Sequence, residues 1–185
     1  MKSWTLPASL GLVLVLSACE GTRVPLGELR MPMPTLPAPE ACGPRGAAST
    51  PRLKLPRTEA PLRSGTSDGQ PADFAQVHTV NQALQNAGVW TDFEEGWSLL
   101  SLQLRSDGAR SIAVRLREAK LPKQTEIWLC GGDARSRQGP YREASAGELW
   151  TPVVPGAEAQ VQVWLPTALK GEFQALLADV YGGYP

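Results

Sequence analysis

Hydrophobic and polar residues alternate along the second half of the chain, a pattern typical of strands with one buried and one solvent-facing side. The alternating or apolar runs cover residues 97–104, 112–117, 126–130 and 161–165. They are separated by the turn and strand-breaking signals Asp107-Gly108, Leu121-Pro122, Gly131-Gly132-Asp133 and Pro166. A last run, residues 172–181, fits a strand or a helix, and its neighbours favour a strand. The pattern predicts an all-β fold, an antiparallel, jelly-roll-like β-sandwich over residues 73–185.

A helical spacing precedes these strands. Apolar residues recur every three or four positions, at Phe74, Val77, Val80 or Asn81, and Leu84. Asp73 with Gln76 resembles a capping box, and Gly88 stands where a helix would stop. The sequence therefore predicts one short helix at the start of the domain.

Residues 19–72 show neither the alternation of a strand nor the helical spacing of apolar residues. This stretch holds many of the chain's 17 prolines, including Met31-Pro32-Met33-Pro34 and Leu36-Pro37-Ala38-Pro39. Proline removes backbone donors and blocks helix continuation. We expect a disordered, semi-extended linker between the N-terminal segment and the sandwich.

Residues 1–18 have the features of an export signal. Lys2 precedes an apolar stretch, residues 6–16, that is shorter than the roughly 20 residues of a membrane span. The sequence Leu16-Ser17-Ala18-Cys19 resembles the lipobox of bacterial lipoproteins, which implies that Cys19 is acylated and anchors the protein in a membrane. An ordinary signal peptide with an incidental cysteine is the alternative. Glu20, in place of a retention aspartate, favours the outer over the inner membrane of the cell envelope.

Several motifs of the domain occur in one order. They are Gly139-Pro140-Tyr141, Gly147-Glu148-Leu149-Trp150-Thr151-Pro152, Val161-Gln162-Val163-Trp164-Leu165-Pro166 and Val180-Tyr181-Gly182-Gly183-Tyr184. They resemble the non-catalytic region that precedes the protease domain in secreted serine proteases of the lysyl-endopeptidase type. The protease domain that usually follows in that family is not expected here. The resemblance implies an accessory domain whose partner is a separate exported, trypsin-like protease.

The residue types argue against catalysis and against nucleic-acid binding. The single histidine, His78, lies in the predicted helix, and no serine stands in a Gly-Asp-Ser-Gly-type run. The 18 basic and 18 acidic residues give no net charge, whereas nucleic-acid binding needs a basic face. No metal-ligand spacing or phosphate-binding loop appears, so we expect no cofactor, no metal and no enzymatic activity.

Two cysteines remain if Cys19 is acylated. An exported protein meets an oxidising compartment, which favours a disulfide between Cys42 and Cys130. The alternative is two free thiols, with Cys130 a buried strand residue.

Aromatic residues supply the candidate binding residues. Trp128 and Trp164 are out of phase with the apolar residues beside them and so could face outwards, to meet a glycan or a peptide. The alternative is that both faces of the sheet are partly covered and these indoles belong to the core. Trp97 and Trp150 are expected in the core. Arg115 and Arg117 share one strand face and either solvate that face or contact an acidic ligand.

These observations predict an envelope-anchored, non-enzymatic lipoprotein that binds an exported protein, with a serine protease as the first candidate. Two alternatives remain open. The domain could be a cell-surface carbohydrate-binding or adhesive module, or a structural lipoprotein of a secretion or envelope complex.

Overall fold

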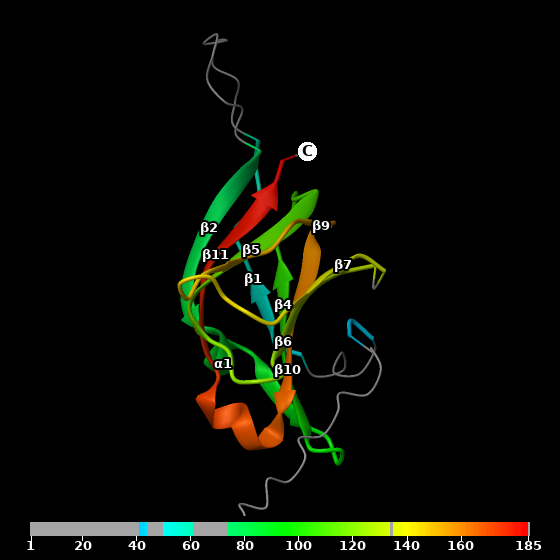
Figure 1. The fold of residues 1–185 in the computed structure, drawn as a ribbon. Helices are drawn as coiled ribbons and strands as arrows, with labels where there is room; N and C mark the ends of the chain where they lie inside the picture. The colour runs from blue at the N-terminus through cyan, green and yellow to red at the C-terminus, as the bar shows by residue number, and fades with distance from the viewer. Residues whose placement is uncertain (1–40, 44–49, 61–73, 134, 185) are drawn as a thin grey trace, which may run out of the picture. The chain divides into compact units, whose positions relative to one another are not determined.

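The structure of the protein is a computed structural model that describes residues 41–43, 50–60, 74–133 and 135–184. In this part of the chain, two mainly antiparallel sheets pack face to face, as Figure 1 shows. The expected all-β sandwich is confirmed at this level. The predicted signal peptide and the predicted acylation site, Cys19, lie outside the described residues.

The first sheet has six strands, in the order β1–β4–β10–β6–β7, and β3 also pairs with β4. The strands are β1 (Arg52–Lys54), β3 (Val89–Asp92), β4 (Trp97–Arg105), β6 (Glu126–Gly131), β7 (Arg137–Tyr141) and β10 (Glu158–Pro166). The long β4 pairs with β10 from Trp97 to Arg105, and only β1 runs parallel to its neighbour. The central strands of this sheet are therefore the runs that the alternation predicts.

The second sheet has five strands, in the order β2–β11–β5–β8, and β9 also pairs with β5. The strands are β2 (Ala75–Ala83), β5 (Ser111–Lys120), β8 (Leu149–Trp150), β9 (Val154–Pro155) and β11 (Gln174–Gly183). The run for which helix and strand both remained possible is thus the strand β11. It lies in the middle of its sheet, between β2 and β5.

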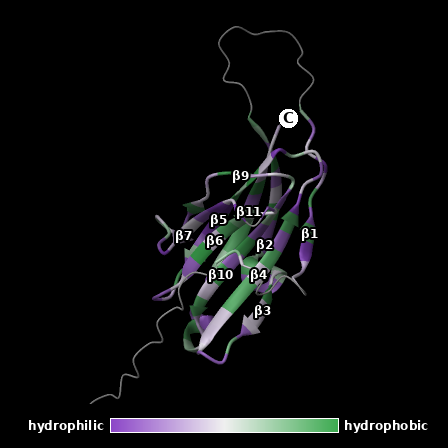
Figure 2. Ribbon diagram, turned by 90° about the vertical axis from the view of Figure 1, so that its right-hand side faces the viewer, coloured by the Kyte–Doolittle hydropathy of each residue, from purple (hydrophilic) through white to green (hydrophobic). Residues whose placement is uncertain are grey.

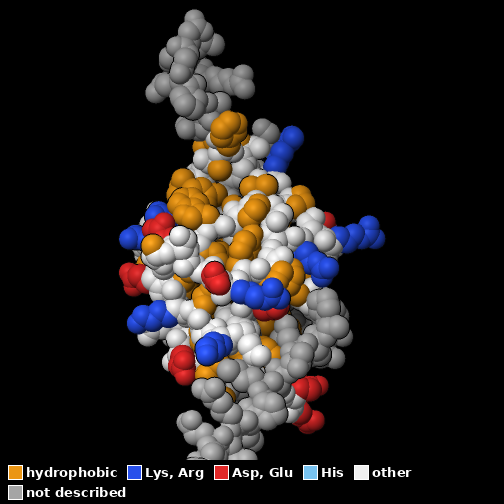
Figure 3. Space-filling view, viewed as in Figure 1, with side chains coloured by type: hydrophobic (Ala, Val, Ile, Leu, Met, Phe, Trp, Pro, Cys, Tyr) orange, Lys and Arg blue, Asp and Glu red, His pale blue; other side chains and the backbone are white. Residues whose placement is uncertain are grey.

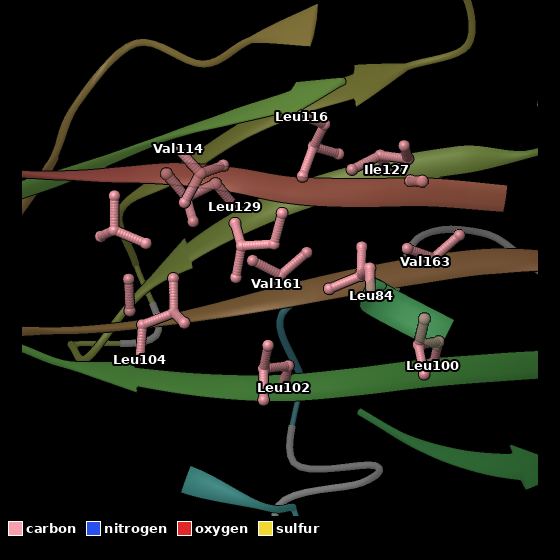
Figure 4. Close-up of a cluster of buried hydrophobic side chains, with 14 of the residues drawn as sticks. Leu84, Leu100, Leu102, Leu104, Val114, Leu116, Ile127, Leu129, Val161 and Val163 are labelled. Atoms are coloured by element: carbon pink, nitrogen blue, oxygen red, sulfur yellow. The ribbon is translucent and has the colours of Figure 1, made fainter. Parts of the chain in front are cut away.

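Aliphatic side chains from both sheets fill the space between them. Figure 4 shows side chains of β4, β5, β6 and β10 pointing toward one another, with Leu84 beside Val163 and Leu100. Leu100, Leu102 and Leu104 are fully buried and occupy every second position of β4. Burial of one such side chain contributes roughly 1.5–3 kcal/mol. The hydrophobic colour along the central strands in Figure 2 follows from the same alternation.

The helix predicted between Asp73 and Gly88 is wrong for most of its length. Residues Ala75–Ala83 form the strand β2, and only Leu84–Ala87 form a helix, α1. Pairing with β11 outweighs the helical spacing of the apolar residues. The strand was not evident from the sequence because its hydrophobic pattern is inverted: the polar His78 is buried and the apolar Val77 is exposed. One 3₁₀ helix, η1 (Thr167–Glu172), precedes β11, and no helix of the described part is long and apolar enough to cross a bilayer.

The expectation of a disordered linker before residue 73 is corrected for residues 41–43 and 50–60. Arg52–Lys54 pair with β4 as the strand β1, and Leu55 joins the main core. Thr58 is also buried. Few apolar residues are needed here, because pairing with a strand of an existing sheet satisfies the backbone hydrogen bonds and leaves alternate side chains in water.

Candidate functional site

The outer side of the first sheet is occupied by the beginning of the described chain. Cys42 and Cys130 form a disulfide, with their Cα atoms 5.4 Å apart, and so join residue 42 to strand β6. The backbone N–H of Cys42 donates to Gln162 Oε1, at 2.9 Å. Cys42, Leu99, Trp128, Cys130 and Trp164 form a second hydrophobic cluster there. The disulfide and this cluster fix the N-terminal segment on this face.

Trp128 and Trp164 do point away from the main core, as their phase predicts, but neither is available to a ligand. Their side chains are only 7% and 6% exposed. Trp164 stacks on Phe93, with ring centroids 5.4 Å apart, and its indole N–H donates to Gln162. The expectation that one of these two tryptophans is an exposed binding residue is therefore wrong.

His78 belongs to a buried polar cluster between the two sheets. Its Nε2 lies 3.2 Å from Thr58 Oγ1 and 3.3 Å from Ser106 Oγ, and these two hydroxyls are 2.7 Å apart. Burial lowers the pKa of His78, so the neutral ring is favoured. Ser106 is fully buried and its hydroxyl also donates to the carbonyl of Pro56. This cluster ties the N-terminal segment to β2, and a substrate has no access to its hydroxyls.

The outer side of the second sheet carries the exposed aromatic residue that the sequence misplaced. Trp150 was expected in the core, yet it is 53% exposed, whereas Trp97 is buried as expected. Trp150 lies opposite Arg115 on the neighbouring strand, and Tyr181 lies between Val77 and Ala113. The side chains of Val77, Ala113, Arg115, Trp150 and Tyr181 form a continuous surface that we call the aromatic face.

Figure 3 shows hydrophobic side chains grouped over β2, β11 and β5, beside several charged ones. Val77 is 52% exposed, and Val153, which follows β8, is 56% exposed.

Trp150 is held in place by its neighbours. Its ring centroid is 5.4 Å from that of Tyr181, and the Arg115 guanidinium carbon lies 4.6 Å from the Trp150 ring centroid. The indole N–H donates to Glu148 Oε2, at 3.4 Å. An aromatic side chain that is already ordered loses little conformational entropy when it binds, which favours affinity.

The charged groups of this face are paired with one another. Arg115 donates to Glu148 at 2.8 Å and lies 3.6 Å from Asp179, while Arg117 lies 3.7 Å from Glu148. The hydrogen bond from Arg115 lowers the pKa of Glu148, and the same contact raises the pKa of Arg115. Burial raises the pKa of Tyr181, and Asp179 adds to that shift. Arg117 is exposed and Arg115 is partly buried, and both belong to one ion-pair network, so this surface carries mixed charge beside its apolar side chains.

The arrangement suits binding rather than bond breaking. The hydrogen bond from Arg115 lowers the pKa of Glu148, so this carboxylate is not held as a general acid. Within the described ranges, no group of histidine, cysteine, aspartate or glutamate side chains could hold a metal ion.

The sequence identified Arg115 and placed it correctly on a strand face. It missed Trp150 and Tyr181, because nothing in the sequence beside them distinguishes an exposed aromatic side chain from a buried one.

No protein-family model matches the sequence, and no solved structure matches the fold.

Proposed function

We propose that this protein is an envelope-anchored, non-enzymatic lipoprotein that binds an exported protein through the aromatic face. A secreted serine protease is the first candidate partner, in keeping with the resemblance of residues 88–184 to the region that precedes such proteases. Acylation of Cys19 provides the anchor, with the outer membrane favoured over the inner. The jelly-roll-like connectivity belongs to the same proposal. It is supported by the pairing of β2 with β11, near the two ends of the domain.

One observation carries this proposal: Trp150, on the edge strand β8, is ordered and half-exposed beside Tyr181 and a charged border. Tryptophan, tyrosine and arginine are the residue types enriched at the energetic centres of protein interfaces. Contiguous exposed apolar surface of this kind marks interaction sites in soluble domains.

The position of the N-terminal segment supports the same function. Residues 41–42 are fixed on the outer side of the first sheet, whereas the aromatic face is the outer side of the second. A chain that reaches the sandwich from a membrane on one side leaves the other side open to a partner. Positions 19 and 42 are 23 residues apart, so a polyproline-II segment between them would span roughly 70 Å.

The test uses the full chain, tagged and expressed in its native host in place of the untagged protein. Proteins recovered with the wild type, Trp150→Ala and Val153→Ala are compared by quantitative mass spectrometry. We expect the wild type and Val153→Ala to enrich a serine peptidase. Trp150→Ala should recover at least tenfold less, because loss of a central tryptophan costs about 2 kcal/mol or more. Equal recovery by the two variants, or no peptidase with the wild type, would refute the proposed partner.

The anchor is tested separately with Cys19→Ser. We expect this variant to lose incorporation of labelled palmitate and to leave the membrane fraction. Retention of both label and membrane association would show that Cys19 is not the site of acylation.

A glycan is the second candidate ligand. The Trp150 and Tyr181 rings lie 5.4 Å apart beside Arg115, Glu148 and Asp179. Apolar sugar faces stack on aromatic rings, while hydroxyl groups bond to arginine and carboxylate groups. Binding of the full chain to a glycan array, lost in Trp150→Ala and kept in Trp164→Phe, would favour this function over protein binding.

A further inference from the structure

The strand β2 is an edge strand without the usual protection against pairing. It is nine residues long and contains no charged residue and no proline, with the sequence Ala-Gln-Val-His-Thr-Val-Asn-Gln-Ala. Edge strands expose unpaired backbone N–H and C=O groups, and proteins usually protect them with charges, prolines, bulges or short length. From Ala75 to Thr79 the register with β11 has no shift, and within the described ranges no strand pairs with the other side of this part.

The other edge strands of the described part all carry such protection. β1 has three residues, of which Arg52 and Lys54 are charged, and β7 contains Arg137 and Pro140. β3 has four residues and ends at Asp92, while β8 and β9 have two residues each. β2 is therefore the exception in this sandwich.

Within the described ranges, β2 forms its ladder with β11 alone. The side chains of its first residues bond elsewhere: Gln76 accepts from the backbone N–H of Glu59, His78 bonds to Thr58 and Ser106, and Thr79 donates to Asp179. The irregularity that ends the free edge lies at Asn81, whose φ is 50°. Residues 75–80 thus offer about one short strand's length for pairing.

We propose that two copies of this protein pair through β2, antiparallel and around a twofold axis, so that their second sheets join into one. In a twofold interface, β2 of one copy pairs with β2 of the other. The strand is suited to this pairing because it has no charged residue that would repel the same residue of the second copy. Val77 is exposed on the outer side, where an outward residue of the second copy would cover it.

The pairing has a defined geometry. Directly opposite residues of an antiparallel pair point to the same side of the sheet, with Cβ atoms about 4.5–5.5 Å apart. The outward residues Val77 and Thr79 of one copy must then meet outward residues of the other. The two aromatic faces would become continuous, giving a bivalent surface for the partner. The dimer does not depend on the proposed partner, and either inference can fail without the other.

The first test co-expresses two differently tagged copies of the full chain and measures how much of one co-purifies with the other in detergent. Val77→Lys places a charge on the free edge, whereas Val153→Lys introduces the same group at a position of similar exposure outside β2. We expect at least tenfold less co-purification for Val77→Lys and no change for Val153→Lys. Equal co-purification by both variants, or none with the wild type, would overturn the dimer.

A second test locates the contact. Cysteine is introduced at Val77, at Thr79, at both, or at Val153 in the exported full chain, and covalent dimers are measured on non-reducing gels. We expect dimers from at least one of the three β2 variants and at least tenfold less from Val153→Cys. Dimers no more abundant from the β2 variants than from Val153→Cys would refute pairing through this strand, including the case in which residues 61–73 or a partner's strand covers β2.

Discussion

Replacing Cys42 and Cys130 by alanine should remove a large part of the stability of the sandwich. The disulfide joins positions separated by 88 residues. For a loop of this length, the chain-entropy model gives a stabilisation of about 4.5 kcal/mol at 25 °C. With a urea dependence of about 2 kcal/mol per molar, the midpoint of unfolding should fall by about 2 M.

The measurement is urea unfolding, followed by tryptophan fluorescence, of the wild type, the double variant and each single variant. Because either substitution opens the loop, Cys42→Ala alone should lose nearly as much free energy of unfolding as the double variant. A reducing agent should lower the wild type to the level of the double variant. Leu55→Ala is the packing control, since it removes a buried side chain of the same segment and leaves the covalent loop closed. Its disulfide should still respond to reduction.

Two results would refute this reasoning. A loss below about 1 kcal/mol in the double variant would mean that the unfolded chain is not restricted by the bond. Single variants that lose clearly different amounts, with the double variant equal to their sum, would show that packing of the two side chains matters more than the loop.

Three further predictions follow from the described contacts. Trp150→Ala should change the free energy of unfolding by less than about 1 kcal/mol, because the side chain is half-exposed, so any loss of partner recovery would report on binding. Gly182→Ala should destabilise by about 1–3 kcal/mol in urea unfolding, since the added Cβ would collide with Thr58, whereas Gly171→Ala has open space and should not. Burial lowers the pKa of His78, so its contribution to stability is complete above about pH 6.5 and is lost as the pH falls toward the lower folded-state pKa. The urea midpoint should therefore drop between about pH 7.5 and about 5.5 in the wild type and less in His78→Gln, and equal slopes would contradict the assignment.

Much of the fold could be predicted because the central strands bury one side each. At residues 97–104, 112–117 and 161–165 the alternation alone places the strands, and β4, β5 and β10 contain them. The strand β2 could not be found this way. Its inward His78 is satisfied by two hydroxyls from elsewhere in the chain, and its outward Val77 is apolar, so the binary pattern is reversed.

The candidate site was harder to predict, because exposure depends on what covers each sheet. Trp128 and Trp164 have the phase of outward residues, but the segment at Cys42 packs on their face. Trp150 lies in the short strand β8, at the edge of the second sheet. Nothing in its immediate sequence distinguishes an exposed indole from a buried one. Only the long-range pairing of Arg115 with Trp150 and of Tyr181 with Val77 reveals the surface.

The central position of β11 in the second sheet affects when this domain can fold. Thr79 of β2 bonds to Asp179 of β11, 100 residues later, so a ribosome produces the strands on both sides of β11 before β11 itself. Such distant pairing makes folding slow. If the protein is exported as proposed above, the polypeptide would therefore stay unfolded for most of its passage through a translocon, and the second sheet could close only after β11 has crossed.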